Sequence, residues 1–232
     1  MMNDRPDQYS EHPKYPVAID CVIFGYEDDE LKLLLYPRRF DPQKGAWSLM
    51  GGFVQEEESM DDTVKRVLKL TVGLENIYVD QVGAYSEPER DPGGRVISMA
   101  YYALIRIDEH DKELVSQKGG KWWPITEKPD LIFDHGKMVE DAMKQLQTKA
   151  SYQLIGKELL PKYFTLTQLN NLYNAIFQRN FNAGNFRKKL ASLNLLDKIN
   201  KKDTSNSKRG AYYYKFKNSK RNIKHERIVK FR

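Results

Sequence analysis

Three glycines, five acidic side chains and a single arginine fall within residues 51–74. This segment, GGFVQEEESMDDTVKRVLKLTVGL, runs from a glycine loop through an acidic loop into apolar spacing that predicts a helix over 60–70, ended by Gly73. Carboxylates grouped in this way can hold Mg²⁺ and so activate a diphosphate toward hydrolysis. That chemistry requires several of the acids to share one helical face.

The order of glycine loop, acidic loop and helix resembles the Nudix box, G-x5-E-x7-R-E-U-x-E-E-x-G-U, where U is apolar. The positions that match its spacing are Gly52, Glu58, Arg66, Gly73 and Leu74. AWSLMGGFV before the box, and EPERDPGGRVISMAYYALI, WWPI and IFDHGKMVEDAM after it, resemble other parts of the same fold. The resemblance implies a Nudix fold over about residues 12–150.

Three glutamates of the box are replaced in this sequence. After the arginine, the box places glutamates at spacing i, i+3, i+4, which brings three carboxylates onto one helical face. Val67, Leu70 and Thr71 occupy these positions. We therefore expect no metal site, no catalytic residues and no hydrolase activity. Glu58 is expected to pair with Arg66, and the remaining acids suit the positive end of the helix dipole.

A fold that keeps this architecture without its catalytic acids still offers a pocket for a sugar or a nucleotide sugar. Asp20 interrupts an apolar strand, where an acid must be hydrogen-bonded; a structural role and ligand binding both remain open for it. Other candidates come from strand ends and loops. The full set of expected effector-binding residues is Asp20, Arg38, Arg39, Trp47, Glu58, Glu87, Arg90 and Arg95.

The elements around this segment predict a mixed sheet flanked by helices. YPVAIDCVIFGYE and LKLLLYPRR flank the acidic turn EDDE and form a predicted hairpin. ENIYVDQVGAYSEP, RVISMAYYALIRI and GGKWWPI predict three more strands. A second helix is expected over about 135–148, with Asp134 as its N-cap. The fold class is therefore α+β.

The C-terminal part carries a helix-turn-helix pattern. Thr165-Leu166-Thr167-Gln168 is a capping box, and helically spaced apolar residues follow it. The turn NFN leads into a second helix with Phe186, Leu190 and Leu193 inward and NFRKK outward. LLDKI and AYYYKFK predict two strands around a polar, basic loop, NKKDTSNSKRG, which suits a wing.

The net charge changes sign near residue 150, shortly before the helix-turn-helix pattern begins. Residues 1–150 hold 19 basic and 28 acidic residues, a net of −9, whereas residues 151–232 hold 19 and 4, a net of +15. A small domain with this excess suits a polyanionic partner, most simply nucleic acid. We expect a domain boundary between 1–152 and 153–232.

The C-terminal half is similar to the winged helix of the Nudix-related transcription regulators, and the similarity lies in the segments FTLTQLNNLYNAIF and NFRKKLASLNLL. In that family a Nudix-like domain senses a metabolite and a dimer holds an operator through its winged helices. The resemblance implies that Asn185, Arg187 and Lys188 enter the major groove. The residues expected to meet mostly phosphates are Lys189, Lys201, Lys202, Lys208 and Arg209.

Composition excludes several other classes. The chain has no run of eighteen apolar residues, and its N-terminal stretch lacks the apolar core of a signal peptide. Cys21 is the single cysteine, which excludes an internal disulfide framework and suits the cytoplasm. The four histidines are scattered, so no cofactor or metal is expected.

The sequence thus predicts a bacterial, cytoplasmic, DNA-binding transcription regulator that binds a double-stranded operator, and does so as a homodimer. Its effector is expected to be an unphosphorylated sugar, such as the pentose arabinose, because the metal that would bridge a pyrophosphate is not expected to bind. The alternatives are a regulator of NAD metabolism sensing ADP-ribose, or an active Nudix hydrolase of nucleoside diphosphate derivatives. A plain assembly module is a further alternative.

Overall fold

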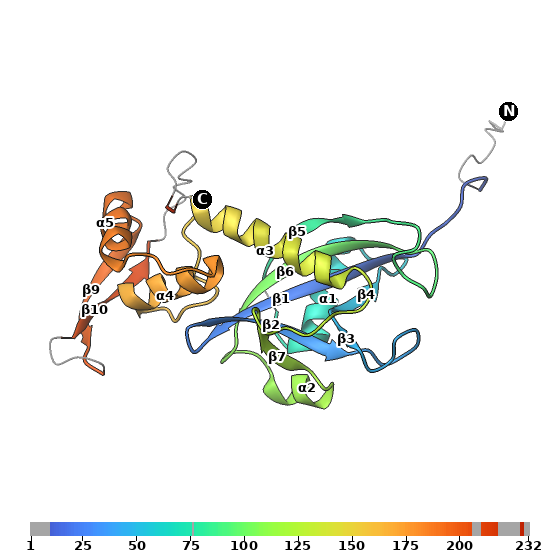
Figure 1. The fold of residues 1–232 in the computed structure, drawn as a ribbon, viewed down its shortest axis with the longest axis horizontal. Helices are drawn as coiled ribbons and strands as arrows, with labels where there is room; N and C mark the ends of the chain where they lie inside the picture. The colour runs from blue at the N-terminus through green and yellow to red at the C-terminus, as the bar shows by residue number, and fades with distance from the viewer. Residues whose placement is uncertain (1–9, 76, 206–209, 218–227, 230–232) are drawn as a thin grey trace.

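The computed structural model describes residues 10–75, 77–205, 210–217 and 228–229. It shows a larger N-terminal body built on a sheet and a smaller C-terminal body beside it, with helix α3 lying along the sheet and reaching the C-terminal body at its end (Figure 1). The strands of the N-terminal body are β1 (Val17–Glu27), β2 (Glu30–Pro37), β3 (Trp47–Ser48), β4 (Met50–Phe53), β5 (Tyr78–Tyr85), β6 (Ile97–Arg106) and β7 (Lys121–Pro124). Its helices are α1 (Met60–Val72), α2 (Lys112–Gln117) and α3 (His135–Tyr152).

The sheet is mixed, as the sequence predicts. Its main order is β3-β2-β1-β6-β5, in which β1 pairs antiparallel with β2 and parallel with β6. β4 also pairs with β1, and β7 with β2. Side chains alternate along β1, so Val22 and Phe24 join the core under α3 while Ile19, Cys21 and Ile23 join the core under α1. This double burial explains why β1 reads as a continuous apolar run.

Helix boundaries follow local signals. Ser59 and Asp62 form a reciprocal capping box at the start of α1, and Gly73 ends it with φ 72° in the left-handed region. The first helix thus runs to Val72, two residues beyond the predicted end, and its Leu70 is 54% exposed. The second predicted helix is longer than expected and ends at Tyr152.

The C-terminal body has the predicted helix-turn-helix and wing. Its elements are β8 (Phe164–Thr165), α4 (Leu166–Phe177), α5 (Ala183–Leu193), β9 (Leu196–Asp203) and β10 (Ala211–Phe216), with strand order β8-β10-β9. The predicted capping box is present: the Thr165 hydroxyl accepts from the Gln168 amide N–H, and the Gln168 side chain accepts from the Thr165 N–H at 2.8 Å.

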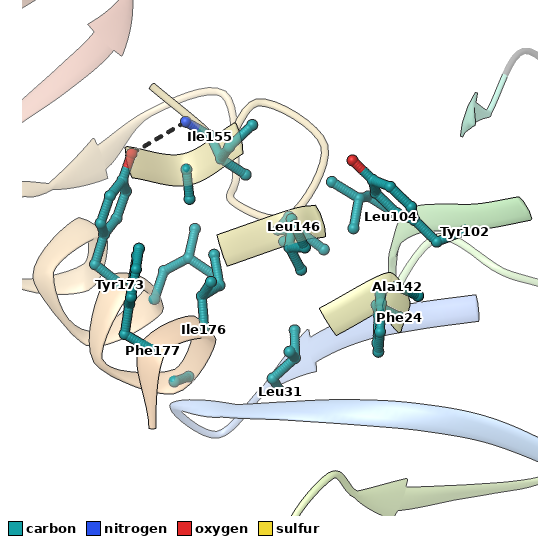
Figure 2. Packing of buried hydrophobic residues seen from close by; sticks show 14 of the residues in the cluster. Phe24, Leu31, Tyr102, Leu104, Ala142, Leu146, Ile155, Tyr173, Ile176 and Phe177 are labelled. Carbon is teal, nitrogen blue, oxygen red and sulfur yellow. Dashed lines mark hydrogen bonds between the residues drawn. The ribbon is translucent and has the colours of Figure 1, made fainter. Parts of the chain in front are cut away.

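One apolar core runs through both bodies. Leu146 and Ala150, near the C-terminal end of α3, belong to the same buried cluster as Phe24 of the sheet and Tyr173 and Ile176 of α4 (Figure 2). The last part of α3 therefore packs against the first helix of the C-terminal body. The boundary between residues 152 and 153 stays a prediction.

Candidate effector pocket and DNA-binding surface

A pocket of about 350 Å³ opens where the start of β1, the end of β2 and the start of α3 meet. Its walls combine cationic, aromatic and backbone groups. The residues that line it include Asp20, Arg38, Arg39, Phe40, Gly51, Gly52, Phe53, Arg90, Asp91, Lys118, Phe133 and His135. A cavity of this size, with a few convergent polar groups, is typical of a small-molecule site.

Asp20 stands at the floor of the pocket and is 8% exposed. Its Oδ2 accepts a hydrogen bond from the Ser98 hydroxyl at 2.6 Å and lies 3.7 Å from the Arg90 Nη2. Its Oδ1 lies 3.6 Å from the His135 Nε2. The buried acid predicted from the sequence thus has both a structural partner and a place in the pocket wall, so the two roles left open for it are compatible.

Arg90 is the most buried cation of the pocket, with a side chain only 3% exposed. Its Nε and Nη2 donate to the two carboxylate oxygens of Asp134 at 2.8 and 2.7 Å. This forked geometry fixes the guanidinium plane. Asp134 is the N-cap residue of α3, as predicted, but its side chain makes no capping hydrogen bond and its carboxylate is engaged by Arg90 instead.

His135 opens helix α3 and is buried. The Leu49 backbone N–H donates to its Nδ1 at 3.1 Å, so the neutral ring carries its proton on Nε2, toward Asp20. Burial lowers the pKa of His135 below its usual 6.5, and this outweighs the opposing effect of Asp20. The imidazole is therefore neutral at pH 7.

The glycine pair sets how closely the loop approaches β1. A Cβ on Gly51 would lie 2.4 Å from the Ile19 carbonyl oxygen and 2.6 Å from the Asp20 Oδ1. At Gly52 the nearest contact would be the Val67 Cγ2 at 3.3 Å. Gly51 is thus required by close backbone approach beside the pocket.

Arginines and aromatic rings form the other side of the pocket. The Arg38 guanidinium lies 4.9 Å from the Phe133 ring centre and 5.5 Å from that of Phe40, within cation–π range. Arg39 and Phe40 are exposed at this edge, and Phe40 is 67% exposed. The Lys118 ammonium lines the pocket and donates to the Leu70 carbonyl. A ligand entering here meets positive charge and flat apolar surface.

The DNA-binding candidates lie on the C-terminal body. Asn182 caps α5, its side chain accepting from the Asn185 N–H at 3.0 Å. Asn185, Arg187 and Lys188 are exposed on the first turns of this helix, and Arg187 also donates to the Thr167 hydroxyl at 3.2 Å. On the opposite face, Phe186 is buried against α4 with its ring 5.0 Å from that of Tyr173.

The wing adds further cations. Lys201 and Lys202 are exposed on β9, and Lys189 of α5 is half-buried. Lys208 and Arg209 lie outside the described residues, so their predicted phosphate contacts stay predictions. Sequence reasoning missed one arrangement here: the Tyr212 ring of β10 lies under the Lys198 ammonium at 3.5 Å and near that of Lys202 at 4.8 Å.

Comparison with known proteins bears on both bodies. Residues 14–142 match the NUDIX domain family, and residues 156–216 match the family described as the NrtR DNA-binding winged helix domain. The NUDIX match covers more than half of the chain. The chain belongs to the NUDIX family and also carries the NrtR DNA-binding winged helix domain. The predicted Nudix fold and C-terminal winged helix are thus confirmed.

Individual relatives agree with this assignment. The structure of Shewanella oneidensis NrtR complexed with a 27mer DNA is 31% identical with a TM-score of 0.78, covering 87% of this chain and 93% of that one. An ADPR responsive transcriptional repressor from Acinetobacter baylyi is 29% identical over 213 residues, 90% of this chain and 85% of the relative. An ADP-ribose pyrophosphatase from Methanocaldococcus jannaschii is 35% identical over 133 residues, 57% of this chain and 75% of the relative.

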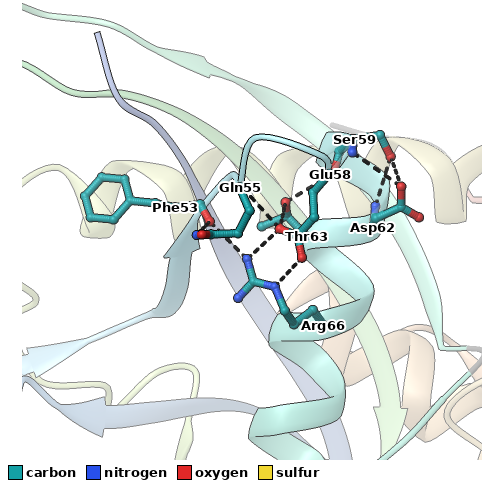
Figure 3. Close-up of polar contacts among 7 residues, drawn as sticks. All are labelled: Phe53, Gln55, Glu58, Ser59, Asp62, Thr63 and Arg66. Carbon is teal, nitrogen blue, oxygen red and sulfur yellow. Dashed lines mark hydrogen bonds and ion pairs between the residues drawn. The ribbon is translucent and has the colours of Figure 1, made fainter.

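The Nudix box retains its structural ion pair. Arg66 donates from Nε to Glu58 Oε1 at 2.5 Å and from Nη2 to Glu58 Oε2 at 2.7 Å, as the sequence predicts (Figure 3). Arg66 also donates to the Phe53 carbonyl at 3.0 Å, which ties the glycine loop to α1. The bonds from Arg66 lower the pKa of Glu58 to about 2, helped by the Thr63 hydroxyl.

The three replaced glutamate positions now serve other purposes. Val67 is buried in the core under α1, and Thr71 is 1% exposed with its hydroxyl donating to the Val67 carbonyl at 2.5 Å. Leu70 faces outward. The face that holds carboxylates in the box is thus partly packed into the protein. Among the described residues, no group of three acids, histidines or cysteines is arranged to hold a metal ion.

The structure brings together half of the predicted effector residues. Asp20, Arg38, Arg39 and Arg90 line the pocket. Four others do not. Trp47 packs edge-on against Trp123 with ring centres 5.4 Å apart, and Glu58 is held by Arg66. The Glu87 side chain is exposed, and Arg95 donates to the Ser86 carbonyl at 2.6 Å and stacks on Tyr15.

Several pocket residues had no clear signal in the sequence. Phe40, Phe133 and His135 come from loops or a helix start, and their neighbours in the chain do not mark them as functional. A signal existed for Ser98, which does not line the pocket but supports it: it is a polar residue in an apolar strand, and its hydroxyl donates to Asp20. In the described residues, each helix is too short or too polar to cross a bilayer.

Proposed function

We propose that this protein is a transcriptional repressor whose Nudix domain binds ADP-ribose without hydrolysing it and whose winged helix binds an operator. The observation that carries the proposal is a cationic pocket on a Nudix domain joined to a DNA-binding winged helix. Both the Acinetobacter repressor and the Methanocaldococcus pyrophosphatase carry ADP-ribose in their names. This supports the alternative effector raised by the sequence, and the preference for arabinose is set aside.

The charge of the pocket supports an anionic effector. Arg38, Arg39, Arg90 and Lys118 line it against two acids, Asp20 and Asp91. Arg90 is already occupied by Asp134, but no acid partner holds the exposed Arg39 among the ion pairs of the described residues. Arginine suits phosphate because its fork donates two parallel hydrogen bonds. An unphosphorylated pentose would leave Arg39 without a counter-charge.

The absence of hydrolysis is proposed from the packing of the box. Without carboxylates at Val67, Leu70 and Thr71, Mg²⁺ lacks its usual oxygen ligands on α1. A diphosphate would then keep its charge and resist attack by water. The similarity to a pyrophosphatase keeps the active hydrolase as the second candidate function.

The DNA side of the proposal rests on α5 and the wing. The first turns of α5 present Asn185, Arg187 and Lys188 outward, as a recognition helix does in the major groove. Lys201 and Lys202 on β9 supply charge for phosphates. Helix-turn-helix proteins read two half-sites through a two-fold dimer, so we propose that this protein binds its operator as a homodimer.

Isothermal titration calorimetry with ADP-ribose and arabinose tests the effector. We expect ADP-ribose to bind and arabinose to give no heat. Arg38→Ala should weaken ADP-ribose about tenfold, the loss of one charge-assisted hydrogen bond. Arg95→Ala is the control, because Arg95 does not line the pocket; this variant should bind ADP-ribose with an affinity within about twofold of the wild type. Binding of arabinose but not ADP-ribose would restore the pentose hypothesis.

A further inference from the structure

Two rigid elements run from the effector pocket to the winged helix. The β1–β2 hairpin contributes Asp20 and Arg38 to the pocket at its open end, and its turn reaches α4 (Figure 1). Helix α3 contributes His135 to the pocket at its first turn and packs on α4 near its last turns. A ligand in the pocket therefore sits between the near ends of two elements whose far ends both contact one helix, α4.

Helix α3 is fastened firmly to the sheet. Lys149 donates to Asp80 on β5 at 2.8 Å, and Tyr85 donates to Asp141 at 3.1 Å. At the far end, the Gln147 side chain donates to the Ile176 carbonyl of α4 at 2.9 Å. Buried apolar side chains surround this contact (Figure 2). The α3–α4 junction thus resembles the inside of a domain and is costly to rearrange.

The hairpin meets α4 through a polar, exposed turn as well as through the buried Leu31 of β2. Asp28 and Asp29 form a two-residue turn with φ 52° and 61°, the type I′ geometry that aspartate tolerates. One carboxylate oxygen of Asp29 accepts from the Tyr26 hydroxyl at 2.9 Å, and the other accepts from the Asn171 amide of α4 at 2.8 Å. Among the described residues, this exposed hydrogen bond is the polar link between the hairpin turn and α4, and it lies two residues before Leu31 of β2, which is buried in the core shared with α4.

The space around the tip is open. Asp29 lines a hollow of about 300 Å³ with Asn174 of α4 and its C-cap residue Gln178 on one side, and a second of about 310 Å³ with Leu159 and Gln168 on the other. A polar group at such an open site can exchange a hydrogen bond to protein for one to water with little net change in free energy. Of these contacts with α4, the exposed Asp29–Asn171 hydrogen bond is the one that a small movement at the pocket can make or break while the buried side chains stay packed.

We propose that the Asp29–Asn171 hydrogen bond is a coupling contact, through which an occupied pocket changes the orientation of α4 and so the affinity of the winged helix for DNA. The inference rests on the proposed function, because it names the regulation of the same pocket. Asn171 is then a positioning residue that contacts neither effector nor DNA. Its loss leaves both binding sites intact and reduces only the coupling between them.

The test uses a swap of the two partners in the full chain. N171D places two carboxylates face to face and breaks the bond. D29N/N171D restores it with donor and acceptor exchanged, and asparagine also tolerates the left-handed turn. Q117E is the matched control, because it places a carboxylate against Glu113 in place of an exposed amide hydrogen bond of 3.2 Å on α2. The DNA probe is a 27-base-pair duplex enriched by the protein from a random pool.

The readout is the coupling ratio, defined as the DNA Kd with saturating ADP-ribose divided by the DNA Kd without it. Added charge alters both affinities alike, so it cancels in the ratio. We expect a wild-type ratio of about 5–150, a fall of at least threefold in N171D, and a return to within about twofold of wild type in D29N/N171D and Q117E. A ratio in N171D equal to wild type, or no rescue by the swap, overturns the inference.

Failure of the proposed function gives a different pattern. If calorimetry shows no ADP-ribose binding to the wild type, the effector assignment falls, and a double-mutant cycle without effector decides the inference. D134N releases Arg90 at the pocket, and N171D breaks the hairpin contact. Effects of the two changes on DNA Kd that depart from additivity by more than about twofold support coupling. Additive effects overturn it.

Discussion

Removing the Arg90 side chain tests the electrostatic frame of the pocket. Arg90→Ala leaves the Asp134 and Asp20 carboxylates in the wall without their cation, at side-chain exposures of 23% and 11%. Breaking a fully buried pair costs about 3–5 kcal/mol. Asp134 keeps some contact with water, so the lower end applies and we expect a loss of about 3 kcal/mol. For a chain of this size, that lowers Tm by roughly 6–12 °C.

Two further variants isolate the cause. In Arg90→Ala, adding Asp134→Asn removes one stranded charge and should recover about half of the lost stability, since the desolvation of the carboxylate is relieved. Arg95→Ala removes an arginine of the neighbouring loop that donates to one backbone carbonyl, and it should cost under about 1 kcal/mol. Urea and thermal unfolding measure all three. Equal losses in Arg90→Ala and Arg95→Ala, or no recovery in the double variant, would refute the buried-pair account.

Three other predictions follow from the same contacts. Arg187→Ala should cost about 1–3 kcal/mol of binding free energy on the enriched duplex and reduce the preference of the protein for this duplex over a scrambled one. Lys201→Ala should weaken binding to both duplexes equally and lower the slope of log Kd against log salt by about one. Fluorescence anisotropy across a salt series measures both effects, and identical profiles of the two variants contradict the prediction. The pKa of His135 is lower in the folded protein than in the unfolded chain, so its contribution to the free energy of unfolding is complete above pH 6.5 and declines as the pH falls through the pKa of the folded state. His135→Asn should therefore flatten the loss of Tm between pH 7 and 5. An unchanged slope of Tm against pH contradicts this. Gly51→Ala places a methyl group 2.4 Å from the Ile19 carbonyl and should lower both Tm and ADP-ribose affinity, measured by thermal shift with and without ligand; a neutral result contradicts the close approach.

The sequence was most informative where the signal was local. The spacing of the Nudix box located α1 and Gly73 and predicted the Glu58–Arg66 pair, because an arginine on the second turn of a helix reaches back to the loop before it. The capping box at Thr165 located α4 in the same way. Such motifs span only a few residues and depend little on the rest of the fold.

Pairings across the chain were harder to predict. Asp134 stands where a helix cap belongs, yet Arg90, 44 residues earlier, takes its carboxylate instead. Trp47 was expected to line the pocket, but it packs against Trp123, 76 residues later in the chain, at the edge of the core. Phe133 and His135 reach the pocket only because α3 begins above β1. The spacing of residues along the chain does not indicate these pairs, because they are tertiary contacts that form only in the folded protein.

One titration tests the central claim most directly. ADP-ribose is added, with Mg²⁺ present, to the wild-type protein bound to its enriched duplex, anisotropy follows the DNA, and ³¹P NMR then follows the nucleotide. The account predicts that DNA is released and that the pyrophosphate signals of ADP-ribose remain unchanged. DNA that stays bound, or steady conversion of ADP-ribose to AMP and ribose 5-phosphate that stops in Glu58→Gln, would contradict it.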